Sequence, residues 1–260
     1  MKNRVALITG GASGMGQVMA KQLAAQGAQV VIADLNASAL EATAANSPHI
    51  KAMLCDVTDV HAVGALVARI EQEVGPIHRL AVCAGVMPAG TVNETSADGF
   101  ARAMRINYEG LVYSVKAALP YMLPRRAGQI ILLGSLAGEI FSKNFSAYGA
   151  SKAAVNAFGE VLAEELRDSG IQVLTVRPAA VATPLIQQAI GEGGLTGLRK
   201  QARSGRMATP ETIVTAIEAA LSSGRHGHWH PSAEAQVGSW LRRLFPRLAW
   251  RIANASQNAL

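Results

Sequence analysis

The chain has 260 residues, a length that fits one large α/β domain, and half of them are hydrophobic while only 16% are charged. This composition excludes an intrinsically disordered chain, and no uncharged apolar run reaches the roughly 18 residues needed to span a membrane. The formal charge of +6 equals the net charge of residues 199–260, where nine Lys and Arg accompany three Asp and Glu. We expect a cytoplasmic protein, because the apolar run after Lys2 and Arg4 enters a glycine-rich turn instead of a signal-peptide cleavage site.

The first predicted strand, over residues 4–9, leads into a turn with glycines spaced G-x-x-x-G-x-G. Glycine can adopt positive φ and lets a pyrophosphate approach backbone N–H groups at the positive end of the following helix. The turn therefore predicts a dinucleotide site. The contacting residues expected here are Gly10, Ser13, Gly14, Met15 and Gly16.

Asp34 closes the next predicted strand, over residues 29–33. A carboxylate at this distance from the glycine turn accepts hydrogen bonds from the adenosine ribose and repels a 2′-phosphate. Neither Ser13 nor the neighbouring Leu35 supplies a cation for that phosphate. We therefore expect NAD to be preferred over NADP.

Further short apolar runs alternate with helix-patterned segments, including helices expected from 107 toward 122 and from 148 to 169. This alternation is typical of βαβ units. It predicts a single-domain, Rossmann-like, doubly wound parallel sheet of about seven strands with helices on both faces. The later strands are expected at residues 50–55, 79–83, 129–133 and 172–177, with a short seventh near residue 228.

The unusual residues follow the strands, where parallel sheets bind their ligands. Asp34 ends the second strand, Asp56 follows the third, Ala84 and Gly85 follow the fourth, and Ser135 and Pro178 follow the fifth and sixth. Because these strand ends share one edge, we expect one continuous site for an extended ligand.

The two cysteines and a cluster of histidines are the residue types that most often bind metals. Cys55 and Cys83 each close an apolar run, so we expect buried, free thiols. His226, His228 and His230 alternate as on one face of a strand, but their spacing matches no known zinc motif. We favour an ordinary polar strand face and predict no metal.

Tyr148 and Lys152 are four residues apart at the start of a helix, so their side chains project from the same face. A phenol, with a reference pKa of about 10, becomes a better base when an ammonium favours the phenolate. Ser135, thirteen residues earlier, can hydrogen-bond a carbonyl oxygen and stabilise negative charge on it. Asn107 lies within a helical pattern, where asparagine has no advantage in helix propensity. We therefore expect its side chain to have a functional role or to contact the local backbone.

As a set, these motifs resemble the short-chain dehydrogenase/reductase family over residues 1 to about 225. The resemblance implies that Tyr148 is the catalytic acid/base, that Lys152 lowers its pKa and holds the nicotinamide ribose, and that Ser135 orients the substrate oxygen. It further implies that Asn107 supports a water-linked proton relay and that the protein is a homotetramer or dimer. The motifs that carry it are Thr9-Gly10-x-x-x-Gly14-x-Gly16, Asp56-Val57, Ala84-Gly85, Asn107, Ser135, Tyr148-x-x-x-Lys152 and Pro178 through Thr183.

The resemblance also assigns cofactor contacts. Asp56 is expected beside the adenine, with the Val57 backbone next to it. Two positions depart from the family pattern: Cys83 replaces the usual asparagine of N-A-G, and Ala179 replaces the usual glycine after Pro178. The remaining contacts expected are Leu35, Cys83, Ala84, Gly85, Tyr148, Lys152, Pro178, Val181 and Thr183.

The segments expected to surround the substrate are apolar, which favours a small lipophilic alcohol or ketone. Residues 179–206 are rich in glycine and have the composition of a substrate lid. The pocket residues predicted are Met87, Leu136, Phe141, Phe145 and Leu185.

Residues 232–260 form a basic, amphipathic C-terminal extension that Pro246 should kink or split. Arginines at 243, 247 and 251 repeat beside Trp240, Leu244, Leu248 and Ile252. This pattern suits subunit or pocket packing, which we favour, and also a membrane surface. No nucleic-acid motif accompanies the charge, so no nucleic-acid partner is expected.

The sequence therefore predicts an NAD(H)-dependent oxidoreductase that interconverts a secondary alcohol and a ketone by hydride transfer. Two alternatives from other classes remain open. One is a catalytically silent nucleotide-binding sensor or scaffold, and the other is a membrane-surface-associated protein acting through its basic tail.

Overall fold

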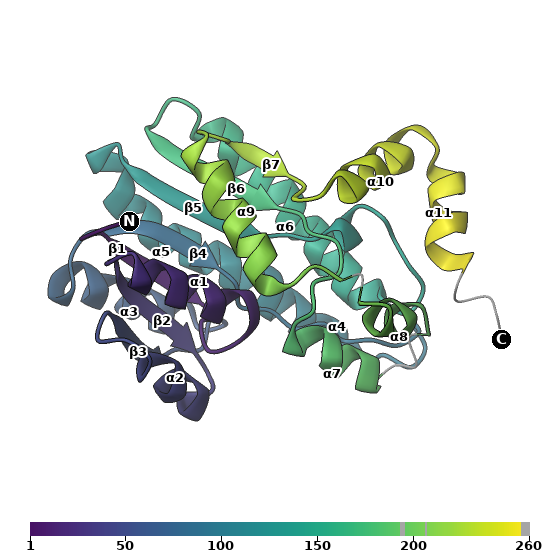
Figure 1. The fold of residues 1–260 in the computed structure, drawn as a ribbon, viewed down its shortest axis with the longest axis horizontal. Helices are drawn as coiled ribbons and strands as arrows, with labels where there is room; N and C mark the ends of the chain where they lie inside the picture. The colour runs from purple at the N-terminus through teal and green to yellow at the C-terminus, as the bar shows by residue number, and fades with distance from the viewer. Residues whose placement is uncertain (193–195, 206, 256–260) are drawn as a thin grey trace.

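Seven parallel strands form one sheet within residues 1–192, 196–205 and 207–255, the part of the chain that the computed structural model describes (Figure 1). Their order is β3-β2-β1-β4-β5-β6-β7, which confirms the predicted doubly wound sheet. The strands are β1 (Val5–Thr9), β2 (Gln29–Asp34), β3 (Ile50–Leu54), β4 (Ile77–Val82), β5 (Gly128–Leu133), β6 (Ile171–Val176) and β7 (Gly227–Trp229).

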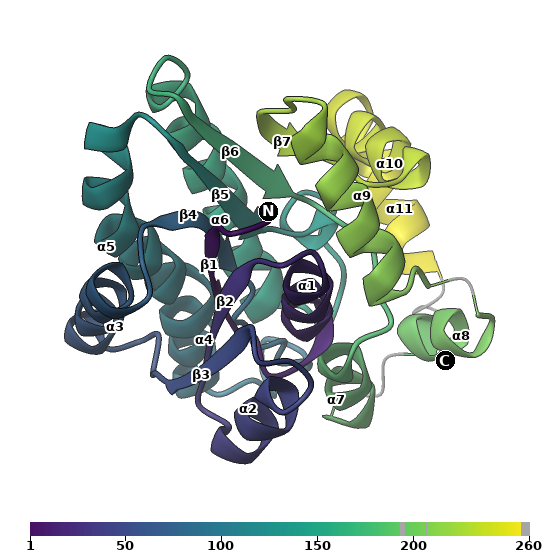
Figure 2. The ribbon, with the colours of Figure 1, turned by 60° about the vertical axis from the view of Figure 1, so that its left-hand side comes forward.

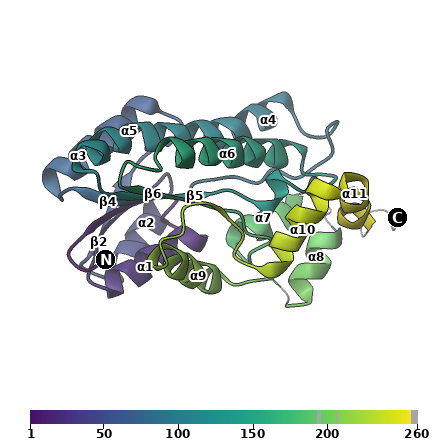
Figure 3. The same cartoon turned by 90° about the horizontal axis from the view of Figure 1, so that it is seen from above.

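Helices cover both faces of this sheet in two layers, which Figure 3 shows edge-on. In β1, Val5 and Leu7 point into one hydrophobic core, and Ala6 and Ile8 point into the other. Because the strands are buried on both faces, their sequences are continuous apolar runs. The first core lies under α3 (Val60–Glu73), α5 (Gly110–Arg125) and α6 (Ser146–Glu165), and the second under α1 (Gly14–Ala25), α2 (Ala37–Ala44) and α9 (Pro210–Ser222).

Short polar side chains fix where several of these helices begin. The Asn36 side chain accepts a hydrogen bond from the N–H of Ala39 at 3.1 Å, and Asp59 accepts from the N–H groups of His61 and Ala62. Such caps satisfy N–H groups that have no partner inside the helix. The strand-to-helix turns are thereby held at the same edge of the sheet.

The strand order reverses between β1 and β4, because β2 and β3 lie on one side of β1 and the later strands on the other. At such a switch point the connections leave in opposite directions and open a crevice beyond the strand ends. The glycine turn after β1 and residues 83–86 after β4 both lie there.

The predicted helix around residue 107 is divided in the structure. Helix α4 (Ala97–Met104) is followed by a π-helical turn (Arg105–Glu109) and then by α5. Asn107 lies in the widened turn, a local form that is common at functional sites. A π-helical turn closes its hydrogen bonds over five residues instead of four. The pattern of apolar residues in the sequence gives no sign of this difference.

The C-terminal third adds four helices beyond the sheet, and Figure 2 shows them together on one side of the molecule. Pro246 separates α10 from α11, as its fixed backbone predicts. Residues 193–195 and 206 of the predicted lid, and residues 256–260 of the predicted extension, lie outside the described residues. The four helices are α7 (Pro184–Glu192), α8 (Thr196–Arg203), α10 (Ala233–Leu244) and α11 (Pro246–Asn254).

Within the described ranges, no helix combines the length and the apolar character needed to cross a bilayer.

Candidate active site

The glycine turn forms a cradle that only glycine can build. Gly10 and Gly14 have φ of +66° and +52°, a region that other residues rarely adopt. At Gly16 an added Cβ would lie 2.3 Å from the carbonyl oxygen of Gly10. The turn therefore packs backbone directly against backbone at the start of α1, where free N–H groups can bind an anion. These residues fit the pyrophosphate of a dinucleotide.

We expect Gly16→Ala to weaken NADH binding by at least about tenfold, because the Gly10 carbonyl must move to admit the methyl group. Fluorescence titration of NADH measures this. Gly64→Ala in α3 is the matched control, since nothing lies within 4 Å of an added Cβ there. Equal NADH affinity in the Gly16 variant and the wild type would contradict the assignment of the cradle.

A cavity of about 320 Å³ extends from the glycine turn along the strand ends. Asp34 lies in its wall, and one of its carboxylate oxygens accepts a hydrogen bond from the N–H of Ala12 at 3.3 Å. Arg102 and Ile106, which the sequence did not suggest, also line it. Thirteen of the predicted cofactor residues line this cavity: Gly10, Ser13, Gly14, Met15, Gly16, Asp34, Leu35, Asp56, Val57, Cys83, Ala84, Gly85 and Thr183.

A second cavity, of about 350 Å³, adjoins the first. Both are lined by Met15, Cys83, Gly85, Leu133, Thr183 and Leu185. The predicted cofactor residues that are absent from the first cavity line the second: Tyr148, Lys152, Pro178 and Val181. The two cavities therefore adjoin each other along the strand ends, between Asp34 and Tyr148.

The wall of the second cavity is mostly apolar. It includes the predicted Met87, Leu136, Phe145 and Leu185, and also Ile140, Ile186, Leu198 and Ala253. Phe141 does not line it, because its ring lies 5.2 Å from the guanidinium carbon of Arg242 in α10 and is 40% exposed. Ala253 comes from α11, more than a hundred residues after Tyr148. The amphipathic pattern of the C-terminal extension suggested packing on the pocket, but it did not single out this residue.

Tyr148 is buried in the wall of this cavity, and its hydroxyl is hydrogen-bonded to that of Ser135. Burial raises the pKa of Tyr148, and the bond with Ser135 lowers it only in part. The sequence led us to expect a pKa lowered by the neighbouring ammonium. Desolvation of the phenolate instead dominates in this structure.

The Lys152 amine lies one helical turn from Tyr148, and its Nζ is 5.8 Å from the centre of the tyrosine ring. Nζ donates a hydrogen bond to the carbonyl oxygen of Leu133 at 2.7 Å. Burial lowers the pKa of Lys152 to about 8, so the ammonium form still prevails at neutral pH. Lys152 therefore brings a positive charge to the point where the two cavities meet.

The Asn107 side chain holds the loop that follows β4. Its amide nitrogen donates to the carbonyl oxygen of Val86 at 2.9 Å and to Ser151 Oγ at 2.8 Å, and its oxygen accepts from the N–H of Val86 at 2.7 Å. Ser151 in turn donates to the carbonyl oxygen of Tyr148. Asn107 thus connects the strand-four loop to the helix that carries Tyr148 and Lys152.

Cys83, where the family pattern has asparagine, keeps the strand-four turn in place through its backbone, whose N–H donates to the carbonyl oxygen of Thr9 at 3.0 Å. Burial raises the pKa of the Cys83 thiol to about 12, and the charge of Lys152 opposes this rise. The thiol is therefore protonated at neutral pH. Ala179 lines the second cavity beside Pro178.

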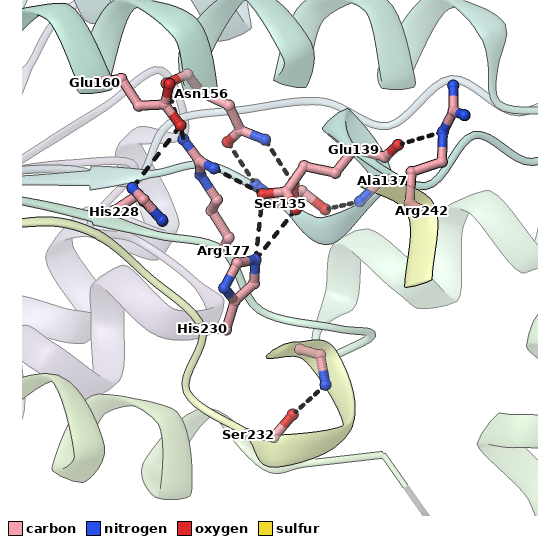
Figure 4. A network of polar contacts seen from close by, with 11 residues as sticks. Ser135, Ala137, Glu139, Asn156, Glu160, Arg177, His228, His230, Ser232 and Arg242 are labelled. Atoms are coloured by element: carbon pink, nitrogen blue, oxygen red, sulfur yellow. Dashed lines mark hydrogen bonds and ion pairs between the residues drawn. The ribbon is translucent and has the colours of Figure 1, made fainter. Parts of the chain in front are cut away.

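Ser135 lies in a loop that a buried ionic network holds against the sheet (Figure 4). Asn156 bonds both the N–H and the carbonyl oxygen of Ser135, at 3.3 and 2.9 Å. Farther along the loop, the Glu139 carboxylate accepts from Arg177 at 2.8 Å and contacts His230 Nε2 at 3.2 Å. The loop is thereby joined to α6, β6 and the segment after β7.

The pKa of Glu139 reflects these contacts. Burial alone raises it, but hydrogen bonds with His230 and Ser239 and the charge of Arg177 outweigh burial and hold the pKa at about 2.

The three alternating histidines have separate contacts. His226 bonds the carbonyl oxygen of Ala163, and His228 and His230 have ring centres 6.2 Å apart. No group of three metal-binding side chains occurs among the residues described.

Comparison with known proteins agrees with this geometry. A family model described as short chain dehydrogenase matches residues 4–192. The chain is 35% identical, over 82% of its length and 86% of the relative's, to 2-dehydro-3-deoxy-L-rhamnonate dehydrogenase (NAD(+)) of Sphingomonas sp.. It is 31% identical, over 88% of its length and 92% of the relative's, to 2,3-dihydro-2,3-dihydroxybenzoate dehydrogenase of Bacillus subtilis.

A solved structure gives the same result for the fold. A short chain dehydrogenase/reductase from Burkholderia phymatum in complex with NAD superimposes with a TM-score of 0.84 at 26% identity, covering 95% of each chain. The chain belongs to the short chain dehydrogenase family and is an oxidoreductase that acts on CH–OH groups.

Proposed function

We propose that the protein interconverts a lipophilic secondary alcohol and the corresponding ketone with NAD(H), and that Tyr148 is the acid/base. One observation carries this proposal. The hydroxyls of Ser135 and Tyr148 lie together, with the Lys152 amine nearby, in the wall of a mostly apolar cavity that adjoins the one that fits a dinucleotide.

In the proposed reaction the Ser135 hydroxyl holds the substrate oxygen, and Tyr148 Oη takes the alcohol proton or returns it to the ketone oxygen. NAD(H), when bound, supplies the hydride acceptor or donor. The Lys152 ammonium, which prevails below its pKa of about 8, opposes by its charge the rise that burial causes in the pKa of Tyr148. Asn107 and Ser151 fix the backbone around Tyr148, so the hydroxyl pair is held in place before a substrate binds.

The wall of the cavity supports a lipophilic substrate. Met87, Phe145, Ile186 and Leu198 offer no charge or hydrogen-bonding group to a sugar acid or a phosphate. Leu185 and Ile186 of α7 and Leu198 of α8 form part of this wall, so we assign the predicted lid to these two helices. The substrate that fits the cavity best has its hydroxyl or carbonyl group at the Ser135–Tyr148 pair and a carbon substituent on either side of that group.

NAD is proposed over NADP because Asp34 lines the cavity directly after β2. We expect Asp34→Asn to improve NADPH binding relative to NADH by about tenfold or more, since the substitution removes a negative charge that repels the 2′-phosphate. Fluorescence titration with both reduced cofactors measures the ratio of Kd values. Asp168→Asn, which removes an exposed carboxylate elsewhere, is the control. An unchanged ratio would show that another group sets the preference.

The experiment that tests the function is a screen of steroids, aryl ketones, aliphatic alcohols and sugar acids, with the absorbance of the reduced cofactor as readout. NAD and NADP are run in parallel, in both directions. We expect turnover of apolar ketones or secondary alcohols with NAD(H). Turnover confined to sugar acids would contradict the proposed substrate class, and cofactor binding without any turnover would favour the sensor alternative.

A further inference from the structure

The two C-terminal helices expose an apolar stripe that faces away from the protein. On α10 it consists of Val237, Trp240 and Leu244, and on α11 of Leu248 and Ile252. These five side chains are between 48% and 67% exposed. Spacings of three and four residues place them on one side of each helix, the pattern that normally faces a core. Figure 1 shows both helices at the far end of the molecule from the N-terminus.

The opposite side of each helix is already packed. Ala235 of α10 and Ala249 of α11 are buried, and an added Cβ at Gly238 would lie 2.9 Å from Ile140. The Asn254 side chain accepts a hydrogen bond from the N–H of Lys143 at 2.8 Å. The stripe is therefore not an unfinished contact with the body of the protein, because small residues make that contact.

Positive charge borders the stripe. Arg243, Arg247 and Arg251 form no ion pair within the described residues, and Glu234 is the one acidic residue of the two helices. An isologous dimer through this surface would bring two arginine-rich surfaces together, and Glu234 is the one carboxylate of the two helices that could compensate their charge. The charge thus disfavours a second copy and favours an anionic partner.

A basic groove continues from the stripe. It has a volume of about 630 Å³ between β7 and α10 and is lined by Arg225, Trp229, Gln236, Trp240 and Arg243, among others, with no acidic residue. The Arg225 guanidinium lies over the Trp229 ring at 5.9 Å. Arginine and tryptophan beside an apolar helix face are the composition of an interfacial membrane helix.

We propose that the apolar stripe and the adjoining groove dock on an anionic lipid bilayer, with the stripe in the interface and the groove against the headgroups. Ala253 of α11 lines the apolar cavity, so the docked surface adjoins the pocket that, under the proposed function, takes a lipophilic substrate. Docking itself requires neither cofactor nor turnover.

Sedimentation with sucrose-loaded vesicles tests this. The full-length protein is expected to sediment with vesicles of equimolar phosphatidylglycerol and phosphatidylcholine, to remain in solution with phosphatidylcholine alone, and to be released by high salt. Combining Arg243→Gln, Arg247→Gln and Arg251→Gln should lower the partition coefficient at least tenfold, since each arginine near an anionic surface contributes a factor of about five. Combining Trp240→Gln and Leu248→Gln should also lower it at least tenfold.

Matched controls change the same side-chain types elsewhere: Val92→Gln is an exposed apolar residue and Lys21→Gln an exposed cation. Both should bind vesicles like the wild type, and NADH titration verifies that every variant is folded. Failure of the wild type to sediment with anionic vesicles overturns the proposal. It is also overturned if the stripe and arginine variants bind these vesicles as strongly as the wild type does. Loss of a solution oligomer in the stripe variants, with no vesicle binding by the wild type, would identify the surface as a protein interface. Absence of dehydrogenase turnover would leave a positive vesicle result intact.

Discussion

Tyr148→Phe is expected to lower turnover by about two to four orders of magnitude, the range that a positioned acid/base contributes. The substitution removes one oxygen atom from a buried ring that packs edge-on against Phe145 at 6.4 Å. Packing is therefore retained, while the group that exchanges a proton with the substrate is lost. NADH binding should persist, because the glycine cradle and Asp34 lie in the adjoining cavity.

The pH profile gives this prediction a second readout. Because burial raises the pKa of Tyr148, little phenolate exists at neutral pH, and alcohol oxidation by the wild type should accelerate as the pH rises toward that pKa. The variant should lack this rise. Tyr121→Phe, at an exposed tyrosine, is the control and should match the wild type in both measurements. Turnover near the wild-type value in the Tyr148 variant would refute its role.

Glu139→Gln is expected to lower the free energy of unfolding by about 2–4 kcal/mol, because it leaves the buried Arg177 without one of its two carboxylate partners. Arg177 is 5% exposed and cannot turn to solvent. Urea unfolding at neutral pH measures the loss. Glu164→Gln is the control, because the Glu164–Arg167 pair is exposed and should contribute less than about 1 kcal/mol.

Acid unfolding supplies a test with a defined sign. The pKa of Glu139 is about 2 in the folded protein and 4.5 ordinarily, so the unfolded chain takes up the proton first as the pH falls. The stability that Glu139 contributes is thus complete above pH 4.5 and disappears toward pH 2. The difference between wild type and variant should shrink over this range. A difference that is constant with pH would show that the carboxylate charge is not what stabilises the loop.

The fold and the centre of the site were predictable because their signals are local. Alternation of apolar runs with helical segments gave the strands, and the glycine turn and Tyr148–Lys152 each lie within a few residues of chain. Asp34, Asp56 and Ser135 could be predicted to lie at one site because parallel strands end at a common edge of the sheet. Each of these inferences needs only secondary structure and strand direction.

What could not be predicted depends on contacts between distant segments. Phe141 is apolar and precedes Tyr148, but its direction is set by Arg242 in α10. The raised pKa of Tyr148 depends on how completely the surrounding loops exclude water, which no local motif encodes. Glu139 is one acidic residue among many until Arg177 and His230 are seen beside it.

The positions in the sequence of the residues that line the two cavities have an evolutionary consequence. The glycine cradle, Asp34, Ser135, Tyr148 and Lys152 all precede residue 184, whereas Leu185, Ile186, Leu198 and Ala253 of the substrate wall follow it. Mutation or segment exchange in the last third of the chain can therefore vary this part of the substrate wall while Ser135, Tyr148 and Lys152 stay unchanged. Met87, Leu136 and Phe145 of the wall precede residue 184 and would be retained. The late part of the wall and the reacting side chains are thus encoded in separable stretches of one gene, which is an arrangement open to recombination and to directed evolution.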